Sequence, residues 1–124
     1  MAEKYWDGKN WLLLLVEKKF TLNKNKFKNI YYYHFYNKKL HRKDGPAEIS
    51  YYENGNKISL EKYYINGNLH RENGPAIIYY FIDGSIRSKL YYFNGIEFKP
   101  EELSFEMPID TEEKKLYIKL KYGG

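Results

Sequence analysis

Two histidine–arginine pairs, His41-Arg42 and His70-Arg71, carry the side chains best suited to chemistry in this chain of 124 residues. An imidazole can act as a general base or as a metal ligand near neutral pH. His34 is the only other histidine and the chain has no cysteine, so a metal site would need carboxylates from elsewhere in the sequence. Both pairs occupy the same place in a repeated motif, whereas a catalytic residue is normally needed once. We therefore favour a structural role and predict no catalytic residue, no metal site and no cofactor.

In a structural role, these pairs would hold the turns around them. Each imidazole is expected to hydrogen-bond the turn that follows it, and each arginine to bridge backbone carbonyls or an acid such as Glu48. The turns themselves, Asp44-Gly45-Pro46 and Asn73-Gly74-Pro75, combine a residue that tolerates positive φ with a proline of fixed φ. One glycine followed by a proline lacks the row of N–H groups that binds phosphate, so neither turn is expected to be a phosphate loop.

The pairs belong to an internal repeat. The octapeptide Leu40–Ala47 (LHRKDGPA) recurs 29 positions later as Leu69–Ala76 (LHRENGPA), and the similarity continues into the residues that follow. Tyr63–Gly67 matches Tyr91–Gly95 at an offset of 28, and a shortened copy at Glu3–Gly8 opens the chain. This spacing indicates tandem units of about 29 residues.

Each unit is expected to form a β-hairpin. Short aromatic runs flank Asn-Gly or Asp-Gly pairs, and these dipeptides tolerate the positive φ that tight hairpin turns require. The residues to which we assign a role in repeat structure are the turn glycines Gly55, Gly67, Gly84 and Gly95, with His41, Arg42, Gly45, Pro46, His70, Arg71, Gly74 and Pro75.

These patterns predict an all-β protein, an antiparallel meander of repeated β-hairpins in a single domain of residues 1–124. Aromatic residues make up 19% of the chain and suit half-buried strands. Residues 1–30 should form a degenerate N-terminal hairpin or cap, residues 31–99 the hairpin repeats, and residues 100–124 a C-terminal turn and capping strand. Pro100 and the acids after it predict a short helical turn near residues 100–105. Apolar and polar residues alternate from Leu116 to Tyr122, which predicts the C-terminal strand.

The Tyr-Tyr-x-Asn-Gly units resemble MORN-type repeats, in the variant found in bacterial antitoxin-like proteins. The Leu-His-Arg-x-x-Gly-Pro-Ala motif is similar to tandem repeats of phage, giant-virus and low-GC bacterial proteins. The resemblance covers roughly Tyr31 to Lys99. It implies an elongated, twisted β-meander that binds a partner without catalysis. MORN units usually end each strand with Gly-Lys; here Gly67-Asn68 and Gly95-Ile96 depart from that pattern, so the resemblance does not extend to lipid binding.

The net charge of +5 is concentrated in one segment. Between Glu17 and Lys43 there are nine Lys or Arg and one Glu, and aromatic residues alternate with the lysines. Such a segment could follow a phosphate backbone while its rings stack on bases. Alternatively, the rings belong to the core and the lysines form a solvated edge that blocks strand addition, or the segment contacts an acidic protein surface. The predicted partner-binding residues are Lys18, Lys19, Lys24, Lys26, Lys28, Tyr31, Tyr33, Lys38, Lys39, Arg42 and Lys43.

We expect a non-catalytic module that binds another protein, because tyrosine-rich hairpins offer a large contact area at low entropic cost. Given the resemblance to phage repeats, the concrete expectation is an inhibitor of a host defence nuclease complex, like an anti-CRISPR protein, or an antitoxin that binds its toxin. The alternative is direct binding of RNA or single-stranded DNA by residues 18–43. The apolar run Trp11–Val16 is too short to span a membrane. A cytoplasmic protein is expected (in the host cytoplasm if phage-encoded), as a monomer or as a homodimer paired through strand edges.

Overall fold

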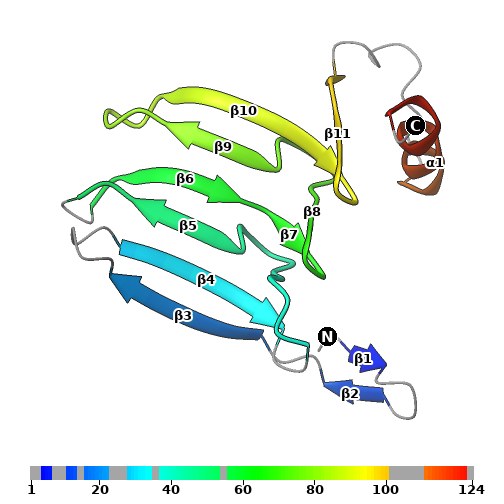
Figure 1. Ribbon diagram of the computed structural model, residues 1–124, viewed down its shortest axis with the longest axis horizontal. Coiled ribbons are helices and arrows are strands. Elements are labelled where there is room, and N and C mark those ends of the chain that lie inside the picture. The colour runs from blue at the N-terminus through cyan, green and yellow to red at the C-terminus, as the bar shows by residue number, and fades with distance from the viewer. Residues whose placement is uncertain are drawn as a thin grey trace.

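In the computed structural model the chain is built mainly from short antiparallel strands (Figure 1). The structure describes residues 4–6, 11–13, 16–22, 28–34, 37–53, 56–100 and 111–122. Seven strands form the main sheet: β3 (Val16–Leu22), β4 (Lys28–His34), β5 (Glu48–Tyr51), β6 (Ile58–Lys62), β9 (Ile77–Tyr80), β10 (Ile86–Phe93) and β11 (Ile96–Phe98). Two small ladders accompany it: β1 (Lys4–Trp6) with β2 (Trp11–Leu13), and β7 (Tyr64–Ile65) with β8 (Asn68–Leu69). The all-β prediction is confirmed.

The sheet is a meander. Its strands lie in chain order, β3-β4-β5-β6-β9-β10-β11, and every neighbouring pair is antiparallel. The β7–β8 hairpin is inserted between β6 and β9 and projects at the same end of the sheet as the β10–β11 turn (Figure 1). Loops separated by one repeat therefore lie next to each other at this end.

Two hairpin turns have the backbone geometry that their sequence predicts. Asn66 and Gly67 have φ values of 48° and 83°, and Asn94 and Gly95 have 49° and 83°. Positive φ at both central residues is typical of the type I′ turn, whose twist matches that of the flanking strands. The loop that contains Asp83-Gly84 is longer than these two-residue turns. The hydrogen bond that closes it runs from the Phe81 N–H to the Ser85 carbonyl, at 2.8 Å. The predicted turn at Asn54-Gly55 lies outside the described residues.

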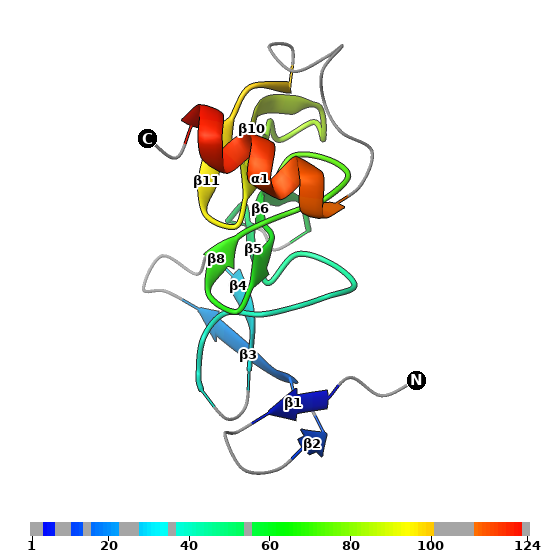
Figure 2. The same cartoon turned by 90° about the vertical axis from the view of Figure 1, so that its right-hand side faces the viewer.

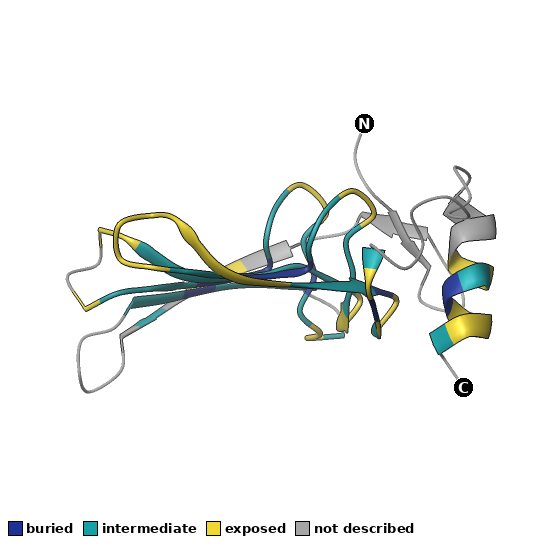
Figure 3. Cartoon of the chain, turned by 90° about the horizontal axis from the view of Figure 1, so that it is seen from above, coloured by how far each residue is buried: buried dark blue, intermediate teal, exposed yellow. Residues whose placement is uncertain are grey.

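The main sheet is a single layer (Figure 3). Directly opposed residues on neighbouring strands share a face, so the register defines two broad faces. One, which we name the groove face, carries Lys18, Tyr32, Ile30, Ile49, Glu61, Ile78 and Lys89. The other, which we name the tyrosine face, carries Lys19, Tyr31, Glu48, Lys62, Ile77 and Leu90.

Isoleucines on the groove face are buried although no described element lies over them. Ile30, Ile49 and Ile78 are 8%, 9% and 6% exposed. Their neighbours on this face, directly opposite or two residues along the strand, include Tyr32, Tyr80 and Lys89, whose long side chains can cover them. This arrangement explains why the sheet is so rich in tyrosine: the ring shields an aliphatic neighbour while the hydroxyl reaches water.

The C-terminal segment is a helix, α1 (Thr111–Tyr122), so the predicted capping strand at Leu116–Tyr122 is wrong. Only Ile118 of the apolar positions is fully buried, whereas Leu116 and Leu120 are 58% and 74% exposed. The helix begins with Thr-Glu-Glu and has Lys119 and Lys121 in its last turn, an order that favours the helix dipole. These end effects outweigh a short alternation that also fits a strand.

Helix α1 covers the end of the sheet and lies over neither of its broad faces (Figures 2 and 3). Ile118 packs with Phe93 and Phe98 in a small core that is 0–4% exposed, and Tyr91, Ile96, Tyr117 and Tyr122 surround it. Of the predicted helical turn near residues 100–105, Pro100 has 3-10 geometry and the rest lies outside the described residues. In the described part of the chain, no helix is both long and apolar enough to cross a membrane.

The N-terminal region contains a small antiparallel strand pair and also the edge of the main sheet. Strands β1 and β2 pair from Lys4–Leu13 to Trp6–Trp11. Strand β3 pairs along its whole length with β4, from Val16–His34 to Leu22–Lys28. Lys18 and Lys19, the first lysines of the basic segment that begins at Glu17, therefore lie on an edge strand.

Candidate binding groove

The two octapeptide loops make the same backbone contacts with the sheet. The N–H of Gly67 donates to the carbonyl of Leu40, and the N–H of Gly95 donates to the carbonyl of Leu69, both at 2.8 Å. Ala47 and Ala76 likewise donate to a carbonyl of the neighbouring strand at 2.9 Å, and both are fully buried. Each loop is thus fixed by the hairpin turn of the next unit.

Both histidines of the repeat hold these hairpin turns. Nδ1 of His41 accepts the Asn66 N–H, and Nδ1 of His70 accepts the Asn94 N–H, each at 3.0 Å. The imidazoles do bond a turn, but it is the Asn-Gly turn of the next hairpin and not the adjacent Gly-Pro turn. Because each Nδ1 accepts a hydrogen bond, the neutral ring carries its proton on Nε2. This geometry gives the pair a structural task.

The arginines cross the Gly-Pro turns and lie on tyrosine rings. Arg42 donates from Nη1 to the Pro46 carbonyl at 3.1 Å, and its Cζ lies 4.0 Å from the ring centroid of Tyr32. Arg71 repeats both contacts at the same distances with its own proline and with Tyr63. The predicted bridge to backbone carbonyls is therefore present in both loops.

The glycines of these turns make room for the arginines. A Cβ added to Gly45 would lie 2.9 Å from Cζ of Arg42, and one added to Gly74 would lie 3.1 Å from Cζ of Arg71. Positive φ was the expected reason for both glycines, but only Gly74 has it, at 148°. For Gly45 the prediction of positive φ is wrong, and space for the guanidinium is the physical reason.

The acid that meets Arg42 is Asp44 and not Glu48. Nε of Arg42 lies 3.1 Å from Oδ1 of Asp44, in an ion pair whose aspartate is 88% exposed. Glu48 lies on the tyrosine face, opposite Tyr31 and Lys62. The second loop has Asn73 at the position of Asp44, and this is the main chemical difference between the loops.

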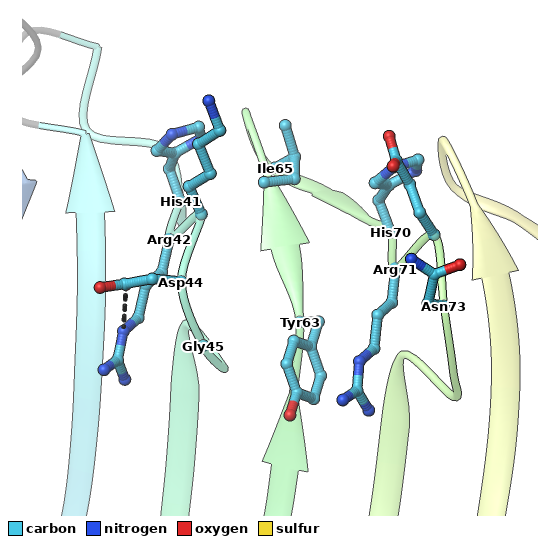
Figure 4. A pocket seen from close by; sticks show the side chains of 11 residues that line it. His41, Arg42, Asp44, Gly45, Tyr63, Ile65, His70, Arg71 and Asn73 are labelled. Atoms are coloured by element: carbon cyan, nitrogen blue, oxygen red, sulfur yellow. Dashed lines mark hydrogen bonds and ion pairs between the residues drawn. The ribbon is translucent and has the colours of Figure 1, made fainter. Parts of the chain in front are cut away.

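A groove of about 630 Å³ lies between the loops on the groove face (Figure 4). His41–Gly45 line one wall and His70–Asn73 the other, with Tyr63 and Ile65 between them. Figure 4 shows the two histidines and Ile65 toward one end and the two guanidinium groups on either side of Tyr63 toward the other. Glu72 belongs to the histidine end, where its Oε1 lies 3.9 Å from Nε2 of His70.

The pKa of Tyr63 depends on its place between the two arginines of the groove. Burial raises the pKa of its hydroxyl most, Glu61 raises it further, and both Arg71 and Arg42 lower it. Both guanidinium groups therefore lie within electrostatic reach of one phenol. Glu61 also accepts a hydrogen bond from the Tyr80 hydroxyl, and burial together with this bond raises the pKa of Tyr80.

On the opposite side of the sheet, several tyrosine hydroxyls interact electrostatically with one another. The pKa of Tyr64 is raised by burial first, then by Glu48, Tyr79 and Tyr92. Burial and Glu48 also raise the pKa of Tyr31. The tyrosine face thus carries half-buried phenols that interact with nearby carboxylates, Glu48 for Tyr31 and Tyr64 and Glu97 for Tyr92.

The predicted partner-binding residues do not form one surface. Lys18, Lys28 and Arg42 lie over rings of the groove face, whereas Lys19, Tyr31 and Tyr33 belong to the tyrosine face. Of the loop residues, Lys43 lines the groove. Lys39 packs beside Gly67, and Lys38 lies 5.7 Å from the Tyr33 ring centroid. Lys24 and Lys26 lie outside the described residues.

Comparison with known proteins adds no relative. No protein-family model, no curated protein and no solved structure matches this chain. Among the described residues there is also no group of three or more His, Cys, Asp or Glu side chains that could hold a metal ion.

The second wall of the groove was not among the predicted binding residues. The sequence pattern assigns His70 and Arg71 to repeat structure alone, and it predicts no partner contact for Tyr63, Ile65 and Asn73. The repeat carries the signal that identifies this wall: Arg71 is the equivalent of Arg42 at an offset of 29, so a partner contact predicted for one applies to the other.

Proposed function

We propose that this chain is a non-catalytic module that binds another protein through the groove face of its sheet. One observation carries the proposal: the main sheet is a single layer, and helix α1 covers its end and neither broad face (Figures 2 and 3). A protein partner would supply the second layer that most sheets have. Half-buried tyrosines held by cross-strand neighbours suit such contacts, because a rigid ring loses little entropy on binding.

The groove supports the choice of face. It is a hollow on this face, its walls are fixed by duplicated hydrogen bonds, and charged groups of both signs line it. A preorganised concave site reduces the cost of ordering side chains on binding. We place its partner in the cytoplasm, where a chain without cysteine needs no oxidising environment.

The resemblance of the repeats to those of phage proteins and antitoxin-like MORN proteins gives the proposal a concrete form. The partner would be a host defence nuclease complex that the chain inhibits, or a toxin that it neutralises. An inhibitor of either kind needs a stable surface and no catalytic set, which agrees with the structural tasks of His41 and His70.

The proposal is tested by capturing the partner with the natural chain and with two charge-reversal variants, one for each face of the sheet. The purified full chain would be immobilised and exposed to a host lysate, and bound proteins identified by mass spectrometry. Lys18→Glu with Lys89→Glu reverses two exposed charges on the groove face. Lys19→Glu with Lys62→Glu makes the same charge change on the tyrosine face. We expect one saturable partner that the first pair loses and the second pair keeps. Equal binding by both pairs, or no saturable partner, would contradict the proposal.

Binding of RNA or single-stranded DNA is the second candidate, favoured by the cations that gather on the groove face. Lys28 lies 4.0 Å from the ring centroid of Tyr51, and Arg42 lies at the same distance from Tyr32. These rings are already covered on one side by the protein's own cations, which leaves less ring surface for bases and makes this candidate the weaker one. Its test is an affinity for oligonucleotides that falls steeply with salt and drops in Lys28→Glu.

A further inference from the structure

The two arginines of the groove differ in one neighbour. Arg42 is paired with Asp44 at 3.1 Å, whereas Arg71 has Asn73 at the equivalent position. Within the described part of the chain, Arg71 forms no ion pair with a carboxylate. The other acids nearby are engaged elsewhere: Glu61 accepts the Tyr80 hydroxyl, and Glu72 lies at the histidine end of the groove.

Arg71 is nevertheless held in place. Nη1 donates to the Pro75 carbonyl at 3.1 Å, Cζ lies 4.0 Å from the Tyr63 ring centroid, and Gly74 leaves the guanidinium the space it needs. A guanidinium has five N–H donors, and this anchoring bond uses one of them. No described residue is seen to accept from the others, which can therefore pair with a ligand in the groove. Because the side chain is already ordered, a ligand that pairs with it loses little of its binding energy to ordering.

The charge of the groove decides which anion fits. Its formal cations are Arg42, Lys43 and Arg71, and its formal anions are Asp44 and Glu72, which leaves a single positive charge in excess. That excess matches a monoanion better than a phosphate dianion. The fork of a guanidinium also matches the two oxygens of a carboxylate.

We propose that the groove binds an aspartate or glutamate side chain of a protein partner, with Arg71 as the cation that pairs with its carboxylate. The amide of Asn73 is a second donor on the same wall, and Ile65 offers an apolar contact for the methylene groups of the acidic side chain. This inference rests on the proposed protein-binding function and names the chemistry of the partner's contact.

Titration with a defined acidic peptide tests the assignment. The probe is a blocked tetraglutamate peptide, the control is the matched tetraglutamine peptide, and the readout is the NMR signal of each arginine Nε–H in the full chain. We expect tetraglutamate to shift the Arg71 signal with saturation and to leave the Arg42 signal in place. Equal shifts with tetraglutamine would overturn the proposal. A stronger response to inorganic phosphate at equal concentration would overturn the carboxylate assignment.

Two isosteric variants exchange the carboxylate of the first loop and the amide of the second. Asn73→Asp gives Arg71 an intramolecular carboxylate like that of Arg42 and should weaken tetraglutamate binding by at least about tenfold, or roughly 1.4 kcal/mol. Asp44→Asn should release Arg42, whose signal then shifts as well. Ser88→Asp, an exposed position on the tyrosine face, adds the same charge away from the groove and should bind as the natural chain does. Unchanged affinity in Asn73→Asp would refute the role of Arg71.

The two proposals fail separately. If the captured partner is lost by the groove-face charge reversal but kept by Asn73→Asp, the module binds a protein without this carboxylate contact. If tetraglutamate binds as expected but no saturable partner is captured, the groove chemistry stands and the protein-binding function falls.

Discussion

The guanidinium carbon of Arg71 lies 4.0 Å from the ring centroid of Tyr63, and Arg42 has the same relation to Tyr32. A cation over a ring stabilises by about 0.5–1 kcal/mol at exposed sites and more where water is excluded. Each guanidinium also ties the Gly-Pro turn to the sheet through a proline carbonyl. In each loop the arginine thus joins the Gly-Pro turn to a tyrosine of the sheet, and both contacts hold the wall of the groove in place.

Replacement of the turn glycines should separate crowding from backbone strain. Gly74→Ala would place a Cβ close to Arg71 at a φ of 148°, a conformation that costs an L-residue about 1–3 kcal/mol. Gly45→Ala meets crowding alone, at the end of a flexible side chain, so its cost should be smaller. Urea unfolding of both variants measures the difference. A larger loss of stability in Gly45→Ala than in Gly74→Ala would show that the backbone argument is incorrect.

Loss of the His41 imidazole should loosen the next hairpin turn. His41 is 3% exposed, and His41→Ala would leave the Asn66 N–H without its acceptor and open a cavity, at a cost of about 2–4 kcal/mol. His41→Asn supplies an oxygen near the position of Nδ1 and should recover part of this loss. Amide exchange at Asn66, followed by NMR, reports the bond directly. Unchanged protection of this amide in His41→Ala would contradict the assigned role.

Features with a local cause could be predicted from the sequence. The type I′ geometry at Asn66-Gly67 follows from two residues that tolerate positive φ, and the meander follows from such turns between aromatic runs. The groove could not be predicted from any short stretch of the sequence. It depends on register, because Tyr63 comes to lie between Arg42 and Arg71 only after strands far apart in the chain pair side by side (Figure 4).

The two wrong predictions have a common reason: in each, the same sequence pattern is compatible with two different structures. A glycine before proline suits positive φ, but at Gly45 it makes room for Arg42. The alternation from Leu116 to Tyr122 suits a strand, yet the preceding Thr111-Glu112-Glu113 favours the start of a helix. Deciding between such causes required knowledge of the neighbouring elements.

Raised tyrosine pKa values predict a loss of stability in alkali. Burial and the hydrogen bond to Glu61 raise the pKa of Tyr80 above the ordinary value of 10.0, and the pKa values of Tyr63 and Tyr64 are also raised. Unfolded tyrosines then ionise at lower pH than folded ones. The stability contribution is complete below about pH 10 and falls as the pH rises above it.

Urea unfolding from about pH 8 to about pH 11, with tyrosinate absorbance as a second readout, measures this fall. Tyr80→Phe removes one of the shifted groups and should make stability less dependent on pH in this range. Stability that rises above pH 10 in the natural chain would refute the assigned direction.

Helix α1 and the strand expected in its place make opposite predictions for two neighbouring apolar residues. In a strand, positions 118 and 120 share a face and would contribute alike. In the helix they lie far apart around the axis, and Ile118 is fully buried against Phe93 and Phe98 while Leu120 is 74% exposed. Ile118→Ala should therefore cost about 2–4 kcal/mol, whereas Leu120→Ala should change stability by less than about 0.5 kcal/mol. Thermal and urea unfolding of the two variants decide the matter: equal losses would support the strand, and a loss confined to Ile118→Ala supports a helix that closes the open end of the sheet.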